Sequence, residues 1–374
     1  MNVRNLLNLP DKFIYTLQVK KITLFFIGIL FITRVFGQSD SSIVYFTKDI
    51  SPEGLLKVFS YVEAEANGNI AFKVHFGEEG NKNYLSPELM KPLVQKLNAT
   101  LVETNVLYVS KRRYTESHIK LAKEHGFTYA PIDILDSEKD TALDINTKHY
   151  KKILTGSHFF NYDTYVICSH FKGHGSAGFG GAIKNVSMGL ASVEGKRALH
   201  ANDVPTTHPD KCMKCGACVK ECPAGAITLD PLTIDRSKCI GCGKCISTCP
   251  VQSFSVARGS AQEIVFLEHL VEYARVLIGQ KKMIYINVLA NISRSCDCAS
   301  FAPKPFLEDI GILVSMDIVA IEKASHDMVD NACACDDAFV KAGNPSGKHQ
   351  IDYAAALKMG NKAYKLVDVD SANR

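Results

Sequence analysis

The chain has 374 residues, a formal net charge of +4, and hydrophobic and charged fractions of 46% and 22%. This length allows one large domain plus a small one, or two medium domains, and the composition is ordinary for a globular protein. So weak a positive charge gives no electrostatic basis for nucleic-acid binding. We therefore expect a globular protein that does not bind nucleic acid.

The first part of the chain, residues 1–40, is predicted to be a signal-like or anchor segment. Lys20 and Lys21 precede an apolar run over 22–33, which is too short to span a bilayer comfortably. The run is typical of the apolar part of a secretory signal, and the small Gly37 is a candidate cleavage site. These residues are left out of the fold prediction.

From residue 41 onward, short β-rich runs alternate with amphipathic helical stretches. Strands are predicted over 43–46, 70–75, 99–103, 131–135, 165–169, 283–288 and 312–314. Helices are predicted over 51–66, 86–97, 115–125, 263–278 and 317–330. The alternation predicts an α/β host domain with a largely parallel sheet, built from residues 41–204 and 259–374.

Some polar and sulfur-bearing residues are predicted to have no functional role. Residues 111–113 form a basic cluster that we expect to be a solvated loop, although Arg112 and Arg113 precede a helix and anion binding is the alternative. His118 and His326 are lone helical histidines, which are more often surface or core residues than ligands. Cys168, at the end of an apolar strand, is expected in the core.

A glycine-rich segment, 172–181, follows the strand predicted over 165–169. Its first three glycines formally fit a dinucleotide-binding fingerprint. However, Gly180 and Gly181 follow at once and would disrupt the helix whose N-terminus must face the pyrophosphate. Nucleotide binding is therefore disfavoured.

The same segment carries basic residues that converge on the loop. Lys172, His174 and Lys184, together with exposed amides, would suit an anionic substrate or a second metal. We predict these three as the catalytic residues. The alternative is a tight turn with solvated bases.

Thirteen cysteines are present and are unevenly placed, with eight between Cys212 and Cys249. A disulfide framework usually belongs to a small secreted chain with a poor core. This chain has ample apolar sequence for a core, so metal binding is the better expectation.

Those eight cysteines form an internal repeat, in which 211–229 aligns with 238–256. Each half has the spacing Cys-x-x-Cys-x-x-Cys-x-x-x-Cys-Pro. Three thiolates separated by two residues can hold three corners of a cubane, and in two-cluster ferredoxins the fourth cysteine ligates the other cluster. The first [4Fe–4S] cluster is therefore predicted to take Cys212, Cys215, Cys218 and Cys249. The second is predicted to take Cys239, Cys242, Cys245 and Cys222.

Zinc is the alternative for these cysteines. Structural zinc sites use separated Cys-x-x-Cys pairs, and two duplicated runs that each end in Cys-Pro do not have that pattern. The block over 205–258 resembles bacterial two-cluster ferredoxins. That resemblance implies a small α+β ferredoxin domain inserted into the host.

Two further cysteine pairs, Cys296/Cys298 and Cys333/Cys335, lie in the second part of the host. In an extended chain, Cys-x-Cys places both thiols on one side. The two pairs together could hold a zinc or iron ion, or either could form a redox-active dithiol. An additional metal at Cys296/Cys298 is thus the further cofactor we consider, and four cysteines without a shared role are the alternative.

Several host motifs match a known pattern. They are Phe76, Gly77, Glu78, Gly80 and Asn81; Thr104 and Asn105; Arg112, Arg113, Thr115 and His118; and the segments 172–185, 296–298 and 309–313. Together they resemble a widespread prokaryotic family of unknown function whose members often carry an inserted ferredoxin module. The resemblance covers most of residues 43–370 and implies an α/β host and iron–sulfur binding, without a substrate.

We therefore predict an iron–sulfur protein that transfers electrons to or from a redox site on the host, as a ferredoxin-linked oxidoreductase. The alternatives are a non-catalytic electron carrier and a metal-handling or redox-sensing protein. The partner would be a redox protein or a small-molecule electron donor or acceptor. Because clusters are expected to be inserted in the cytoplasm, a cytoplasmic location is predicted, with export or anchoring through residues 20–37 as the alternative.

Overall fold

The computed structural model describes residues 41–108, 110–200, 204–222, 224–239, 245, 249–255, 261–299 and 303–371. The predicted signal-like or anchor segment, 1–40, lies outside these residues, and so does Cys242 of the second predicted cluster. Across the described ranges, none of the helices combines the length and the apolar character that crossing a bilayer requires.

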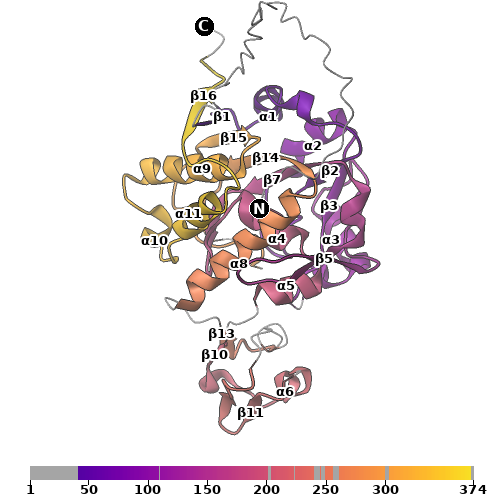
Figure 1. Cartoon of the computed structure of the whole chain (residues 1–374), viewed down its shortest axis with the longest axis vertical. Helices are drawn as coiled ribbons and strands as arrows, with labels where there is room; N and C mark the ends of the chain where they lie inside the picture. Colours follow the sequence, from indigo (N-terminus) through magenta and orange to yellow (C-terminus); the bar gives the residue numbers. More distant parts are fainter. Residues whose placement is uncertain are drawn as a thin grey trace, which may run out of the picture. The chain divides into compact units, whose positions relative to one another are not determined.

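The host is built on an eight-stranded sheet with the order β16-β1-β15-β14-β7-β2-β3-β4 (Figure 1). The strands are β1 (Ser42–Thr47), β2 (Ile70–Lys73), β3 (Thr100–Glu103), β4 (Ile132–Ile134), β7 (Thr164–His170), β14 (Lys282–Leu289), β15 (Gly311–Ser315) and β16 (Tyr364–Asp368). Within this sheet, β15 runs antiparallel to its neighbours β1 and β14, and all other adjacent pairs are parallel. The predicted α/β fold with a largely parallel sheet is therefore confirmed.

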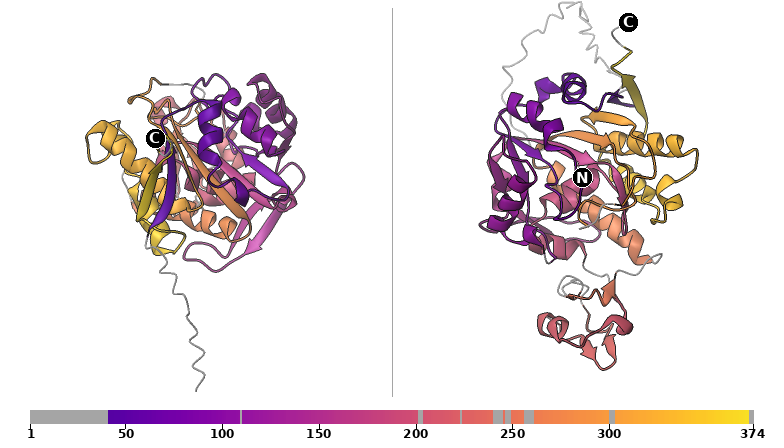
Figure 2. Two further views of the ribbon diagram at one scale, coloured as in Figure 1. Left: turned by 90° about the horizontal axis from the view of Figure 1, so that it is seen from above. Right: turned by 180° about the vertical axis from the view of Figure 1, so that it is seen from behind.

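Helices cover both faces of the sheet (Figure 2). One face packs against α1 (Pro52–Phe59), α2 (Pro87–Lys96) and α3 (Thr115–Glu124). The other packs against α4 (Ala182–Leu190), α5 (Val193–Leu199), α8 (Ala261–Ile278), α9 (Ile318–Cys333), α10 (Ala338–Lys341) and α11 (Lys348–Ala356). In β7, Tyr165 and Ile167 enter one core, and Val166 and Cys168 enter the other. This alternation is that of a strand buried on both faces, and Cys168 is a core residue as predicted.

The chain reverses its winding direction between β2 and β7. From β2 it proceeds outward to β3 and β4, whereas β7 lies on the opposite side of β2 and is followed by β14. Such a reversal leaves a crevice outside the carboxyl ends of the two adjacent strands, where ligands bind in open α/β sheets. The carboxyl ends of β2 and β7 are thus where a site is expected.

The remaining elements are short. Two hairpins belong to the host: β5 (Asp140–Asp144) with β6 (Lys152–Gly156), and β8 (Lys172–His174) with β9 (Gly178–Gly180). The 3-10 turns are η1 (Glu63–Glu65), η2 (Lys111–Arg113), η3 (Ser157–Asn161) and η4 (Pro209–Lys211). Besides η4, the described elements within 204–255 are β10 (Thr206–Thr207) paired with β13 (Phe254–Ser255), α6 (Ala217–Glu221), and β11 (Ile227–Leu229) paired with β12 (Leu232–Ile234).

One predicted helix is much shorter in the structure, and the glycine-rich segment adopts a hairpin. The helix predicted over 51–66 ends at Phe59 and is followed by η1, which buries no residue. A turn without an apolar face has no packing to hold further helix against the sheet. The glycine-rich segment forms the β8–β9 hairpin, in which Gly178 has a φ of +76° that favours glycine.

Candidate functional site

A cavity of about 150 Å³ lies where β2, β3 and β7 end. His75 follows β2, Glu103 ends β3, His170 ends β7, and Cys296 follows β14; all four line the cavity. We call this space the edge cavity. It occupies the crevice that the reversal of the chain between β2 and β7 creates.

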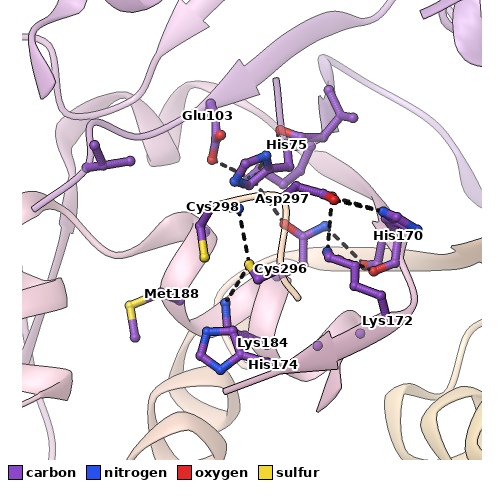
Figure 3. Close-up of a pocket in the computed structure, with 18 of the residues that line it drawn as sticks. His75, Glu103, His170, Lys172, His174, Lys184, Met188, Cys296, Asp297 and Cys298 are labelled. Carbon is purple, nitrogen blue, oxygen red and sulfur yellow. Dashed lines mark hydrogen bonds and ion pairs between the residues drawn. The ribbon is translucent and has the colours of Figure 1, made fainter. Parts of the chain in front are cut away.

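The structure brings the three residues predicted as catalytic to this one space. Lys172 and His174 come from β8, and Lys184 comes from α4; all three line the edge cavity (Figure 3). Their chemical roles stay a prediction.

A buried carboxylate organises one wall of the cavity. Asp297 is 1% exposed, and its oxygens lie 3.0 Å from His170 Nδ1 and 3.1 Å from Lys172 Nζ. Burial alone would raise the pKa of Asp297, but the charges of His170 and Lys172 outweigh it and hold that pKa well below its ordinary value. Asp297 therefore remains ionised and fixes the loop between the two neighbouring cysteines.

Cys296 and Cys298, on either side of Asp297, form a coupled pair of thiols. The backbone N–H of Cys298 donates to Cys296 Sγ at 3.3 Å, and Lys184 Nζ lies 4.0 Å from the same sulfur. The hydrogen bond from the Cys298 side chain, aided by Lys184 and Lys172 against the effect of burial, holds the pKa of Cys296 well below its ordinary value. The pKa of Cys298 is raised, by its hydrogen bond to Cys296 and then by burial. Cys296 is therefore the cysteine of the pair that loses its proton more readily.

His174 completes a group that could hold a metal ion. One ring nitrogen of His174 and the sulfurs of Cys296 and Cys298 all lie within 4.8 Å of one another. Burial, followed by Lys184 and Lys172, holds the pKa of His174 well below its ordinary value, so the ring is neutral. Its Nδ1 accepts the backbone N–H groups of Ser176 and Ala177 at 3.2 and 3.0 Å.

The tautomer of His174 follows from those two contacts. A neutral imidazole that accepts at Nδ1 carries its proton on Nε2, which then donates. A metal at Nδ1 would displace two amide contacts, and a metal at Nε2 would require loss of that proton. In this state His174 is therefore a hydrogen-bond donor toward the cavity, and the two thiols are the better metal ligands.

A second buried network lines another part of the cavity. Glu103 accepts from Lys73 Nζ at 2.9 Å and from Arg112 Nη2 at 2.5 Å. Arg112 also contacts His75 Nε2 at 2.9 Å and His118 Nε2 at 3.3 Å. Because Arg112 is only 2% exposed, the prediction of a solvated loop is wrong for this residue. Glu103 supplies its counter-ion from a strand end that the local sequence around Arg112 does not reveal.

The start of α4 is already occupied by the side-chain carboxyl group of Glu322. The backbone N–H of Ile183 donates to Glu322 Oε1 of α9 at 3.1 Å. A dinucleotide would need its pyrophosphate at such a helix N-terminus. The absence of a nucleotide site stays a prediction.

The two Cys-x-Cys pairs do not form one four-thiolate site. Cys333 and Cys335 are joined in a disulfide with a Cα–Cα distance of 5.3 Å, whereas Cys296 and Cys298 are free. Cys333 ends α9, and Ala334 adopts a left-handed conformation with φ of +50°, which turns the chain back so that the two sulfurs meet. The hypothesis of a site shared by both pairs is wrong.

A second, smaller cavity lies among the cysteines of the repeat. Its lining includes the four cysteines predicted for the first cluster, which are Cys212, Cys215, Cys218 and Cys249. Backbone amides face the sulfurs: Lys214 N lies 3.4 Å from Cys212 Sγ, and Ser253 N lies 3.2 Å from Cys249 Sγ. We call this space the cysteine cavity.

Only part of the second predicted ligand set can be placed. Cys222, Cys239 and Cys245 are described, and Cys242 lies outside the described residues. The backbone N–H of Ala226 donates to Cys222 Sγ at 3.3 Å, which repeats the amide contact seen at Cys249.

Several residues of the edge cavity were not predicted from the sequence, among them His75, Glu103, His170 and Asp297. Asp297 stands between two cysteines, and that position was the one available indication of its role. The others lie at strand ends whose adjacency depends on the order of the strands in the sheet.

Comparison with known proteins gives a family and distant structural likenesses. A sequence model of the family described as "Domain of unknown function (DUF362)" matches residues 70–327. No curated protein matches the chain. Among solved structures, the lactate racemase apoprotein from Thermoanaerobacterium thermosaccharolyticum is 14% identical with a TM-score of 0.35, and the match covers 67% of this chain and 51% of that one.

A structural-genomics protein from Thermotoga maritima is 9% identical with a TM-score of 0.37, covering 76% of this chain and 59% of that one. The chain thus spans about half of the racemase and somewhat more of the second protein.

Proposed function

The chain belongs to the DUF362 family of domains of unknown function, and on that premise we propose that it is an iron–sulfur protein that transfers electrons to or from the edge cavity. Its two [4Fe–4S] clusters would be bound within 205–258. One-electron transfer is the chemistry that such clusters supply when bound. The donor or acceptor would be a redox partner protein or a small molecule.

The observation that carries this proposal is the set of residues around the cysteine cavity. Three cysteines of the first run meet the last cysteine of the second run, Cys249, around one space. That crossed arrangement is the one expected of a two-cluster ferredoxin. A zinc site closed by neighbouring Cys-x-x-Cys pairs would not need Cys249 there.

The surroundings of the sulfurs also suit a cluster. Backbone amides point at Cys212, Cys222 and Cys249, and such N–H···S contacts stabilise the negative charge of cluster thiolates. Burial would raise the pKa of Cys249, but the amides of Ser253 and Val251 outweigh it and lower that pKa. Iron binds the thiolate, so these contacts favour the ligating form.

We assign the redox site of the host to Cys296 and Cys298. When a Cys296 thiolate and a Cys298 thiol close to a disulfide they release two electrons and one proton, and the reverse reaction takes up the same two electrons and one proton. Lys184 stabilises the Cys296 thiolate, while Asp297, held by Lys172, keeps the two cysteines in register. The disulfide at Cys333 and Cys335 supports the premise that this spacing can close in this chain.

Iron counts in double variants test the ligand assignment. Protein purified without oxygen should contain about eight iron and eight sulfide per chain. Cys249→Ala and Cys215→Ala should each lose the same cluster, so the double variant should lose no more iron than the worse single variant. Combining Cys249→Ala with Cys239→Ala should instead remove both clusters.

The reverse pattern would show that each run holds its own cluster and that the crossed assignment is wrong. Cys168→Ala is the matched control, because this core cysteine lies outside the repeat and its loss should leave the iron count unchanged. Zinc with little sulfide would overturn the proposal altogether.

A second candidate function is favoured by the group formed by His174, Cys296 and Cys298. If this group holds a third metal, the same preparation should contain one stoichiometric nickel, zinc or further iron. Cys298→Ser should then remove that metal while the eight cluster irons stay. The absence of any third metal would leave the pair as redox-active thiols.

A further inference from the structure

The edge cavity holds more positive charge than its carboxylates neutralise. Five cationic side chains line it against two carboxylates, Glu103 and Asp297. The five cationic residues are Lys73, Arg112, Lys172, Lys184 and Lys196. Glu78, 3.7 Å from Arg112, adds a third carboxylate just outside the lining. The five cationic side chains therefore still outnumber the carboxylates.

The excess falls on two lysines. Lys73 and Arg112 share Glu103, and Lys172 pairs with Asp297. In the parts of the chain that the structure describes, Lys184 and Lys196 have no carboxylate within ion-pair distance. Lys196 donates to two neutral oxygens, whereas the nearest polar atom recorded for Lys184 Nζ is Cys296 Sγ at 4.0 Å.

A neighbouring histidine, His174, adds a hydrogen-bond donor. His174 presents an Nε2–H toward the cavity, as its two amide contacts at Nδ1 require. His75 and His200 also line the space. Burial is the main reason that the pKa values of all three are lowered, so each is neutral. A group that accepts hydrogen bonds and carries negative charge is what this wall lacks.

Apolar side chains also line the cavity, among them Leu85, Met188 and Phe266, and a cavity of about 150 Å³ is the size that admits a benzene-sized molecule. An inorganic anion would satisfy the lysine but would leave these apolar side chains in contact with water. A short organic acid satisfies the lysine and the apolar side chains at once.

We propose that the edge cavity binds a small organic acid, with its carboxylate at Lys184 and His174 Nε2–H and its apolar body against Phe266 and Met188. This acid would be the substrate class of the redox site proposed above. Only the statement that this acid is a substrate rests on the proposed redox function; the statement that it binds does not. Binding can be measured whether or not the iron counts support the clusters, so the two proposals fail separately.

Direct binding is measured on the full-length protein purified without oxygen. Butyrate and benzoate should bind and raise the melting temperature in proportion to the logarithm of their concentration. Butyramide and inorganic phosphate should bind at least about tenfold more weakly, since one lacks the charge and the other lacks the apolar body. Equal binding of butyramide, or tighter binding of phosphate, would overturn the proposal.

Variants locate the carboxylate. Lys184→Gln should weaken butyrate binding by about tenfold or more, because it removes a charge-assisted contact. Lys120→Gln removes the same charge from a side chain that is 79% exposed in α3, and it should change nothing. An equal effect of both variants would mean that only the overall charge matters.

Alkylation of the native protein tests the same proposal without any substitution, so it does not depend on whether a variant folds. The Cys296 thiolate displaces iodide from either iodoacetate or iodoacetamide, forming a carbon–sulfur bond. If the cavity attracts a carboxylate, the iodoacetate-to-iodoacetamide rate ratio at Cys296, read by peptide mass spectrometry, should exceed that of free glutathione by about tenfold. Butyrate should protect Cys296, and a ratio equal to that of glutathione would contradict the proposal.

Discussion

Replacing Glu103 by Gln removes the carboxylate that two buried cations share. Glu103 is 2% exposed and contacts Lys73 and Arg112, themselves 0% and 2% exposed. Removing one partner of a buried ion pair leaves an uncompensated charge and costs about 3–5 kcal/mol. Spread over roughly 280 host residues at about 2.1 cal/mol/K each, that loss corresponds to a fall in melting temperature of about 5–8 °C.

Thermal unfolding of Glu103→Gln, followed by far-ultraviolet circular dichroism, measures this effect. Glu124→Gln is the matched control, because Glu124 pairs with Lys120 on the surface at 3.9 Å, and such pairs contribute less than about 0.5 kcal/mol. Iron content is measured on each sample so that cluster loss is not mistaken for host unfolding. A Glu103→Gln melting temperature within 1 °C of the control would mean that the buried network does not hold the host together.

Three other variants test further features of the host. Burial raises the pKa of Glu322 to about 8. Its neutral form therefore contributes stability that is complete below pH 4.5 and is lost as the pH rises through 8. Glu322→Gln should flatten the resulting fall in melting temperature between pH 6 and pH 8.5. Gly178→Ala places a Cβ 2.3 Å from Gly347 N at a φ of +76° and should cost more than about 1 kcal/mol in denaturant unfolding, whereas Gly175→Ala on the same hairpin meets nothing within 4 Å and should stay within about 0.5 kcal/mol of wild type. Asp317→Ala removes the cap whose carboxylate accepts from Val319 N at 2.8 Å and should cost about 1 kcal/mol in the same assay.

The pattern of strands and helices could be predicted from the sequence because it depends on local periodicity. A helix start such as Ser51 before Pro52 can be recognised from the local sequence, and so can the apolar run of β7. The direction of a strand could not be predicted in this way. Nothing in the local sequence distinguishes β15, which runs antiparallel to β1 and β14, from the strands that run parallel to one another. The winding reversal between β2 and β7, which creates the edge cavity, is likewise a property of strand order.

The candidate site likewise has a part that could be predicted from the sequence and a part that depends on the fold. Lys172, His174 and Lys184 were predicted because they cluster within one short segment. The partners that set their chemistry come from elsewhere in the chain, as Asp297 does for Lys172. Arg112 was mistaken for a solvated residue because its counter-ion, Glu103, lies on a separate element and only the fold brings the two together.

The energetic cost of burying charged residues in the host helps to distinguish a redox enzyme from a non-catalytic electron carrier. A carrier that used its host only to display a ferredoxin would be more stable with apolar residues at Lys73, Glu103 and Arg112, because well-packed hydrophobic replacements of buried ion pairs are often neutral or stabilising. The host instead places this network in the lining of a cavity that also holds the Cys296/Cys298 pair and a lysine without a carboxylate partner in the described part of the chain. Perturbed groups of this kind gather at functional sites, since chemistry rather than folding requires them. The buried charge therefore argues for a reaction at the edge cavity and against a host that serves only as a scaffold.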